Sequence, residues 1–108
     1  MQILVVEKNP VTLTMFKNLL CELEHDDLKI TALQDGQEAL ELCDRKSFDI
    51  IFLSSNAVGD NGKKVFKRLK ALQGEDTHFV AMTTNRNQDG THNTHLKAGF
   101  DFCLVKPI

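Results

Sequence analysis

The sequence predicts an α/β protein in which helices cover both faces of a doubly wound parallel sheet. Short apolar runs at residues 3–6 and 50–53 are bounded by turn-forming residues, as is typical of strands that are buried on both faces. Amphipathic segments at helical spacing alternate with such runs, and the pattern closes on a further strand. A repeated order of strand and then helix favours a doubly wound parallel sheet.

Five strands are expected, at residues 3–6, 28–33, 50–53, 78–82 and 102–105. Between the first two strands we expect a helix that Asn9 caps and Pro10 begins, because asparagine accepts hydrogen bonds from a first turn and proline fits its first position. The apolar stripe of this helix comprises Leu13, Phe16, Leu20 and Leu23. Met15 and Leu19 widen the stripe, either as core residues or as a protein contact.

Three further helices are expected. One begins at Gly36 and ends near Lys46 with Ala39, Leu40 and Leu42 turned inward. The next spans residues 62–73 and stops at Gly74, a residue that often ends helices. Its inward stripe comprises Val65, Phe66, Leu69 and Leu72. Residues 83–93 are polar and rich in turn formers, and the last helix reaches Ala98.

Length and composition narrow the class of protein. The 108 residues predict a single domain, residues 1–108, that can bury its own core. A net charge of −2 gives no reason to expect nucleic acid or an anionic membrane as a partner. With neither a stretch of transmembrane length nor a leader, a cytoplasmic protein is expected. Cys21, Cys43 and Cys103 are expected to be core residues, since no pair has metal-ligand spacing.

The end of the central strand is the candidate site. Ligands of parallel sheets bind just beyond the carboxyl ends of the strands, and Ser54 directly follows the apolar run at residues 50–53. A serine hydroxyl is a weak nucleophile unless a base lies beside it, and the neighbouring sequence offers no obvious base. A structural hydroxyl is therefore the favoured interpretation of Ser54.

Several short motifs occur in a fixed order. They are ILVVEKNP at residues 3–10, DGQEAL at 35–40, DIIFL at 49–53 with Gly62, AMTT at 81–84, AGF at 98–100 and KPI at 106–108. Together they resemble the receiver domain of two-component response regulators over essentially the whole chain. The resemblance implies a flavodoxin-like sheet with the strand order 2-1-3-4-5. Family members continue into a fifth helix after the Lys-Pro pair, and we expect that helix to be absent from this chain.

The resemblance also assigns roles to single positions, several of which are substituted here. Family members carry two acidic residues after the first strand, where this chain has Glu7 and Lys8. The phosphoacceptor aspartate that ends the third strand is replaced by Ser54. The switch hydroxyl after the fourth strand is kept as Thr83, whereas the aromatic switch position is occupied by Cys103.

These substitutions predict a degenerate phosphorylation pocket. Magnesium prefers carboxylate oxygens, but the pocket offers Glu7 alone, and Lys8 repels a cation. Lys106 matches the lysine that family members keep after the fifth strand, so one negative and two positive charges would meet here. We therefore expect no enzymatic activity, no cofactor, no metal site, and magnesium binding that is lost or weak.

The leading hypothesis is a pseudo-receiver that signals by protein–protein interaction without aspartyl phosphorylation. Its expected partner is a histidine kinase, a phosphotransfer protein or an output domain, and a second copy could form a homodimer. One alternative is an active receiver that uses another acceptor, such as Asp60 in the loop after the central strand. The other is a small-anion sensor in which Lys8, Lys106, Ser54 and Thr83 surround the anion.

Two surfaces are further candidates for contacts. The third helix is basic through Lys63, Lys64, Lys67, Arg68 and Lys70, which form either a solvated face or a contact for an acidic partner. The strands at residues 3–6 and 102–105 are expected to expose apolar surface where a fifth helix would pack, and such patches usually mark contact sites. His92 and His95 are expected to be exposed histidines rather than metal ligands.

Overall fold

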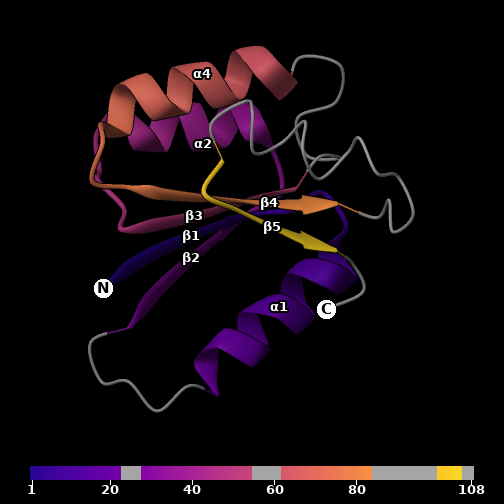
Figure 1. Ribbon diagram of the computed structural model, residues 1–108. Helices are drawn as coiled ribbons and strands as arrows, with labels where there is room; N and C mark the ends of the chain where they lie inside the picture. Colours follow the sequence, from indigo (N-terminus) through magenta and orange to yellow (C-terminus); the bar gives the residue numbers. More distant parts are fainter. Residues whose placement is uncertain (23–27, 55–61, 84–99, 106–108) are drawn as a thin grey trace.

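Five parallel strands form one sheet in the order β2-β1-β3-β4-β5, which confirms the predicted fold (Figure 1). The strands are β1 (Gln2–Val6), β2 (Lys29–Leu33), β3 (Ile50–Ser54), β4 (His78–Thr83) and β5 (Phe102–Val105). This computed structural model describes residues 1–22, 28–54, 62–83 and 100–105. Several predicted features lie outside the described residues: the helix that reaches Ala98, Leu23, Asp60, His92, His95 and Lys106.

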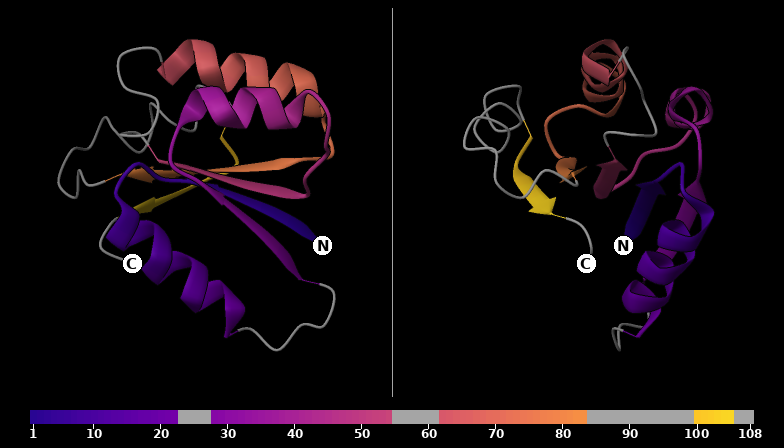
Figure 2. Two further views of the ribbon diagram at one scale, coloured as in Figure 1. Left: turned by 180° about the vertical axis from the view of Figure 1, so that it is seen from behind. Right: turned by 90° about the vertical axis from the view of Figure 1, so that its right-hand side faces the viewer.

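In the described part of the chain, three helices lie on the two faces of this sheet. Helix α1 (Pro10–Cys21) covers one face, whereas α2 (Gly36–Cys43) and α4 (Gly62–Gln73) lie side by side on the opposite face (Figures 1 and 2). Successive strand residues point to opposite faces, so the sheet separates two cores. Ile3 and Val5 enter the core beneath α1, whereas Leu4 and Val6 enter the core beneath α2 and α4.

Aromatic contacts attach the helices to the sheet. The ring of Phe66 in α4 stacks on Phe100 with centroids 3.9 Å apart, and it meets Phe79 of β4 edge-on at 5.3 Å. On the other face, Phe16 of α1 meets Phe52 of β3 edge-on at 4.8 Å. Full burial of one such ring contributes roughly 1.5–3 kcal/mol, so these pairs fix both layers against the sheet.

The helix starts follow the predicted capping. The Asn9 side chain accepts hydrogen bonds from the backbone N–H groups of Val11 and Thr12, and Pro10 occupies the first turn of α1. Helix α4 has the predicted bounds, and Gly74 follows it with a φ of 82°, a conformation that glycine adopts without steric cost. Helix α2 ends at Cys43 rather than near Lys46, because the backbone N–H of Arg45 donates to the carbonyl of Leu42, three residues back, which departs from the four-residue spacing of an α-helix.

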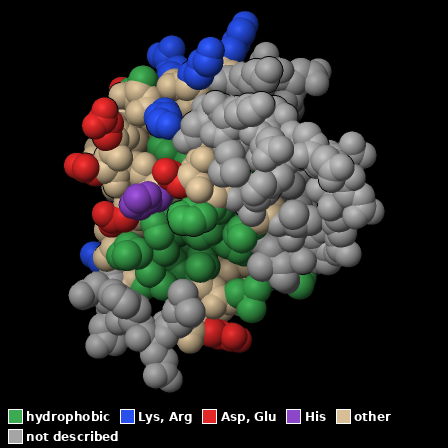
Figure 3. Space-filling model, viewed as in Figure 1, with side chains coloured by type: hydrophobic (Ala, Val, Ile, Leu, Met, Phe, Trp, Pro, Cys, Tyr) green, Lys and Arg blue, Asp and Glu red, His purple; other side chains and the backbone are tan. Residues whose placement is uncertain are grey.

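Several expectations about burial were wrong. Residues 3–6 are buried, because β1 lies between β2 and β3 and α1 covers its outer face. The same expectation is confirmed for β5, where Phe102 is 63% exposed, and Figure 3 shows apolar side chains gathered on this side of the molecule. Leu72 of α4 is also exposed, because it lies at the groove beside α2 rather than beneath its helix. Met15 and Leu19 are exposed, which excludes the core alternative for both.

Candidate functional site

The carboxyl ends of β1, β3 and β4 meet at one edge of the sheet. Val6 pairs with Leu53 and Ser54 pairs with Met82, so Glu7, Ser54 and Thr83 follow one another across neighbouring strands. The structure thus places three of the predicted site positions at one edge. Thr83 and Cys103 are described as strand backbone only, and Lys106 lies beyond the described residues.

Glu7 is fully buried at this edge. Its Oε1 atom accepts a hydrogen bond from the backbone N–H of Asn9 at 3.1 Å, and its own backbone N–H donates to the carbonyl of Leu33. Burying a carboxylate is costly unless hydrogen bonds or a charge compensate it, so this contact stabilises the acid inside the fold. The same bond connects the end of β1 to the capping residue of α1.

Lys8 differs from its neighbour in being exposed. An exposed ammonium keeps its hydration, so the charge of Lys8 lies at the surface of this edge rather than buried beside Glu7. The anion-sensor alternative needs both Lys8 and Lys106 beside Ser54. No contact in the described part of the chain favours that arrangement, and the alternative stays a prediction.

Ser54 is fully buried at the end of β3, in the same layer of the sheet as Met82. A buried hydroxyl differs from a carboxylate in two ways that matter here. It carries no charge to attract a cation, and it is a poor nucleophile unless a base takes its proton. The position therefore suits a structural hydroxyl better than a reactive one.

The donors at this edge fit magnesium poorly. Magnesium requires nearly octahedral coordination and is bound through carboxylates in proteins. At the described ends of β1 and β3, Glu7 is the carboxylate, whereas Ser54 is a neutral hydroxyl and Lys8 is a cation. Elsewhere in the described residues, no group of three or more His, Cys, Asp and Glu side chains could hold a metal ion.

The two cysteines whose side chains the structure describes lie in different environments. Cys43 is buried at the end of α2, and burial raises the pKa of its thiol from 9.0 to about 11. This thiol is therefore protonated and unreactive at neutral pH, as expected for a core residue. Cys21 is exposed, which corrects the expectation that it is a core residue.

Gln73 has a structural role that sequence reasoning missed. Its Oε1 atom accepts from the backbone N–H of Phe48 at 2.7 Å, and its Nε2 atom donates to the carbonyls of Cys43 and Lys46 at 3.1 and 2.8 Å. Thr77 adds a bond from its hydroxyl to the carbonyl of Phe48 at 2.6 Å. The signal in the sequence was a long polar side chain placed just before the helix-ending Gly74.

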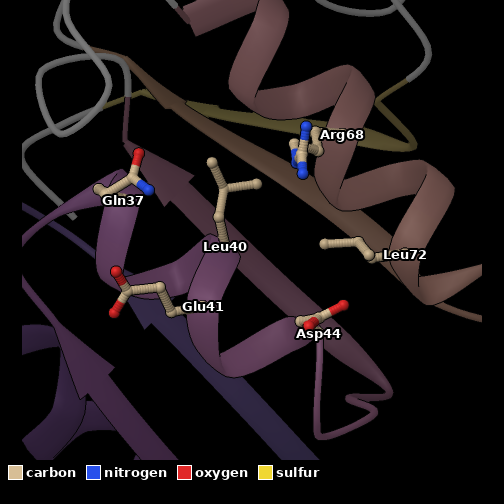
Figure 4. A pocket seen from close by; sticks show the side chains of 6 residues that line it. All are labelled: Gln37, Leu40, Glu41, Asp44, Arg68 and Leu72. Carbon is tan, nitrogen blue, oxygen red and sulfur yellow. The ribbon is translucent and has the colours of Figure 1, made fainter.

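A groove between α2 and α4 was also missed. It has a volume of about 450 Å³ and is lined by Gln37, Leu40, Glu41 and Asp44 of α2 together with Arg68 and Leu72 of α4 (Figure 4). The groove was not predicted because the sequence pattern assigned Leu72 to the core, whereas its side chain lines the groove. The groove lies between the two helices that cover this face of the sheet.

Comparison with known proteins gives related sequences along the whole chain. The sequence profile of the response regulator receiver domain matches residues 3–108. The chemotaxis protein CheY homolog of Campylobacter jejuni is 28% identical over 109 residues, covering 100% of this chain and 82% of that protein. The virulence sensor protein BvgS of Bordetella bronchiseptica is 25% identical, and the match covers 100% of this chain but 9% of BvgS.

Solved structures give the same match. The receiver domain of sensor histidine kinase PA1611 from Pseudomonas aeruginosa is 29% identical, has a TM-score of 0.79, and aligns over 99% of this chain and 85% of its own. That structure holds a magnesium ion in its active site cleft. A CheY-like receiver domain from Methylobacillus flagellatus is 31% identical, with a TM-score of 0.78 and coverage of 99% and 86%. Among the described residues, no helix is long and apolar enough to cross a membrane.

Proposed function

This chain belongs to the response regulator receiver domain family, a family of two-component signalling, and we propose that it is a pseudo-receiver that signals without aspartyl phosphorylation. The observation that carries this proposal is the residue at the end of β3. Ser54 is fully buried there, at the position where the family resemblance places the phosphoacceptor aspartate. Aspartyl phosphorylation at that position needs a carboxylate, and this chain has a serine there.

The charge at the edge supports the same proposal. During phosphoryl transfer the oxygens of the phosphoryl group carry negative charge, and receivers are expected to neutralise this charge with a metal ion held by carboxylates. Glu7 is buried and already accepts a hydrogen bond from Asn9, and its neighbour Lys8 is a cation. We therefore propose that magnesium binding is lost or weak.

The partners we propose are proteins of a signalling pathway. Receiver domains act with histidine kinases and other signalling proteins, and the relatives of this chain include the sensor histidine kinase RcsC of Salmonella typhimurium, 27% identical over 11% of its length. A histidine kinase, a phosphotransfer protein or an output domain is accordingly the proposed partner, in the cytoplasm. The chain spans about a tenth of RcsC and BvgS, so their other activities are not carried over.

Incubation with acetyl phosphate and magnesium, followed by intact mass measurement, tests the proposal. We expect no mass gain that hydroxylamine removes, because an acyl phosphate needs a carboxylate. The Ser54→Asp variant is expected to stay unphosphorylated, whereas Lys8→Asp combined with Ser54→Asp should recover at least magnesium binding.

A hydroxylamine-labile phosphoryl group on the unmodified chain would overturn the proposal. The Asp60→Asn variant then identifies the acceptor, since loss of the label in that variant assigns it to Asp60. If Ser54→Asp were phosphorylated as fast as the double variant that also carries Lys8→Asp, Lys8 would have no effect on the metal position.

A further inference from the structure

The groove between α2 and α4 has walls of opposite charge. Residues 36–44 contain three acids, Glu38, Glu41 and Asp44, and no base, and all three side chains are exposed. Residues 62–73 contain no acid, and their exposed bases include Lys64, Lys67 and Arg68. Leu40 and Leu72 supply apolar surface between the two walls (Figure 4). The face is thus divided lengthwise into an acidic half and a basic half.

The two walls do not neutralise one another across the groove. Among the described side chains, neither Glu41 nor Asp44 forms an ion pair with Arg68, although all three line the same pocket. The basic side chains extend outward over α4, as the cluster of Lys and Arg over that helix in Figure 3 shows. Both charge signs therefore remain available to a molecule that approaches this face.

The identity of that molecule follows from the division of charge. A uniformly acidic surface, such as nucleic acid or an anionic membrane, would be repelled by α2, and a uniformly basic surface would be repelled by α4. Helices α2 and α4 run parallel, because each returns the chain from the carboxyl edge of a parallel sheet to its amino edge. A two-fold axis along the groove consequently places α2 of one copy opposite α4 of the other, on both sides of the axis.

We propose that the α2–α4 face associates with the same face of a second copy of this chain. In that arrangement the acidic Glu41 and Asp44 of each copy face the basic Lys67 and Arg68 of the other copy. Leu40 and Leu72 of both copies meet near the two-fold axis. The association does not depend on Ser54 or on the proposed loss of phosphorylation. It uses a different face of the molecule from the apolar surface near β5.

The size of the face sets the strength of the contact. Helix α4 has 12 residues, which is about 18 Å at 1.5 Å per residue, and two adjacent helices are about 20 Å wide. The contact is therefore about 360 Å² on each copy, roughly half of the ~800 Å² of a standard interface. A transient dimer follows, one that forms at high protein concentration and weakens as salt screens the charges.

Sedimentation equilibrium of the full chain, over a range of concentrations at low and high salt, measures this association. Two variants each reverse one wall: Glu41→Lys with Asp44→Lys, and Lys67→Glu with Arg68→Glu. Each alone should dimerise at least about tenfold more weakly, because like charges then face one another. An equimolar mixture of the two should recover dimers as heterodimers, and one chain that carries all four substitutions should recover homodimers.

Matched controls separate this contact from general effects of charge. Glu75→Lys with Asp76→Lys, and Lys17→Glu with Lys29→Glu, change the net charge equally at exposed positions outside the groove. They should dimerise like the unmodified chain. All substituted residues are exposed, and circular dichroism checks that each variant folds. A monomer at every concentration, a single-wall variant that dimerises as strongly as the unmodified chain, or no recovery in the mixture would each overturn the proposal.

Discussion

Cys43 couples the stability of the fold to alkaline pH. Burial raises the pKa of its thiol from 9.0 to about 11 in the folded chain, so the unfolded chain loses this proton first as the pH rises. The stabilisation is fully present below pH 9 and is lost between pH 9 and pH 11, by at most roughly 1.4 kcal/mol per pH unit.

Urea unfolding of the unmodified chain and of Cys43→Ala, between pH 7 and pH 11, checks this effect. The alanine variant should be less stable at pH 7, because it leaves a small cavity. The difference in free energy of unfolding should narrow above pH 9, where the thiol in the unfolded chain ionises. Stability curves that run parallel from pH 7 to pH 11 would contradict the assigned cause.

The candidate site shows which residues a sequence can place. Glu7 and Ser54 were expected at the same edge because each directly follows an apolar run, and a parallel sheet aligns the ends of neighbouring strands. The exposure of Lys8 could not be predicted in the same way. A long flexible side chain takes its direction from packing that involves the whole edge, and a sequence pattern does not contain that packing.

The connection between α2 and β3 depends on a residue from another element. The Gln73 side chain makes three hydrogen bonds to the backbone of residues 43–48, and Cys43 lies 30 positions away in the chain. This long-range contact explains why the end of α2 was predicted too late. The bounds of α4 were predicted correctly because Gly62 and Gly74, both visible in the sequence, mark its ends.

Replacement of Gln73 by methionine should destabilise the fold by about 2 kcal/mol, since three hydrogen bonds of about 0.5–1.5 kcal/mol are lost at a partly buried position. Gln37→Met makes the same chemical change at an exposed position of α2 and should have little effect. Urea unfolding measures both variants, and hydrogen exchange should show faster exchange at the amide of Phe48 in Gln73→Met. Equal stability of the two variants would show that the bonds contribute little.

At the scale of the whole molecule, the described helices cover the two faces of the sheet unequally. Helices α2 and α4 pack over one face, whereas on the other face α1 lies over β1 and β2. Val80 pairs with Phe102 in register, and Phe102 is 63% exposed whereas Phe79 of the same sheet is fully buried. The overall topology was predictable because periodicity and motif order reflect it. Exposure near β5 was also expected, whereas the burial of β1 was not, because it depends on how the layers fit together.

Phe102→Thr should therefore change the free energy of unfolding by less than about 1 kcal/mol, whereas Phe79→Thr should cost about 3–5 kcal/mol. Threonine is suited to strands, so the comparison isolates burial from strand preference. Urea unfolding measures both variants, and binding of an apolar dye should fall in Phe102→Thr. A large loss of stability in that variant would mean that Phe102 is packed against the rest of the fold.

The parallel course of α2 and α4 has a consequence for avidity. A two-fold axis along these helices also runs roughly along the strands, so it leaves the strand direction unchanged in both copies. The edges that hold Ser54 would then point the same way in the dimer, so a partner that binds one of them would find an equivalent position beside it. A partner with two matching modules would engage the second position at the high effective concentration set by its linker. Weak self-association would in this way make binding of such a partner depend steeply on the local concentration of the chain, even if each single contact has only modest affinity.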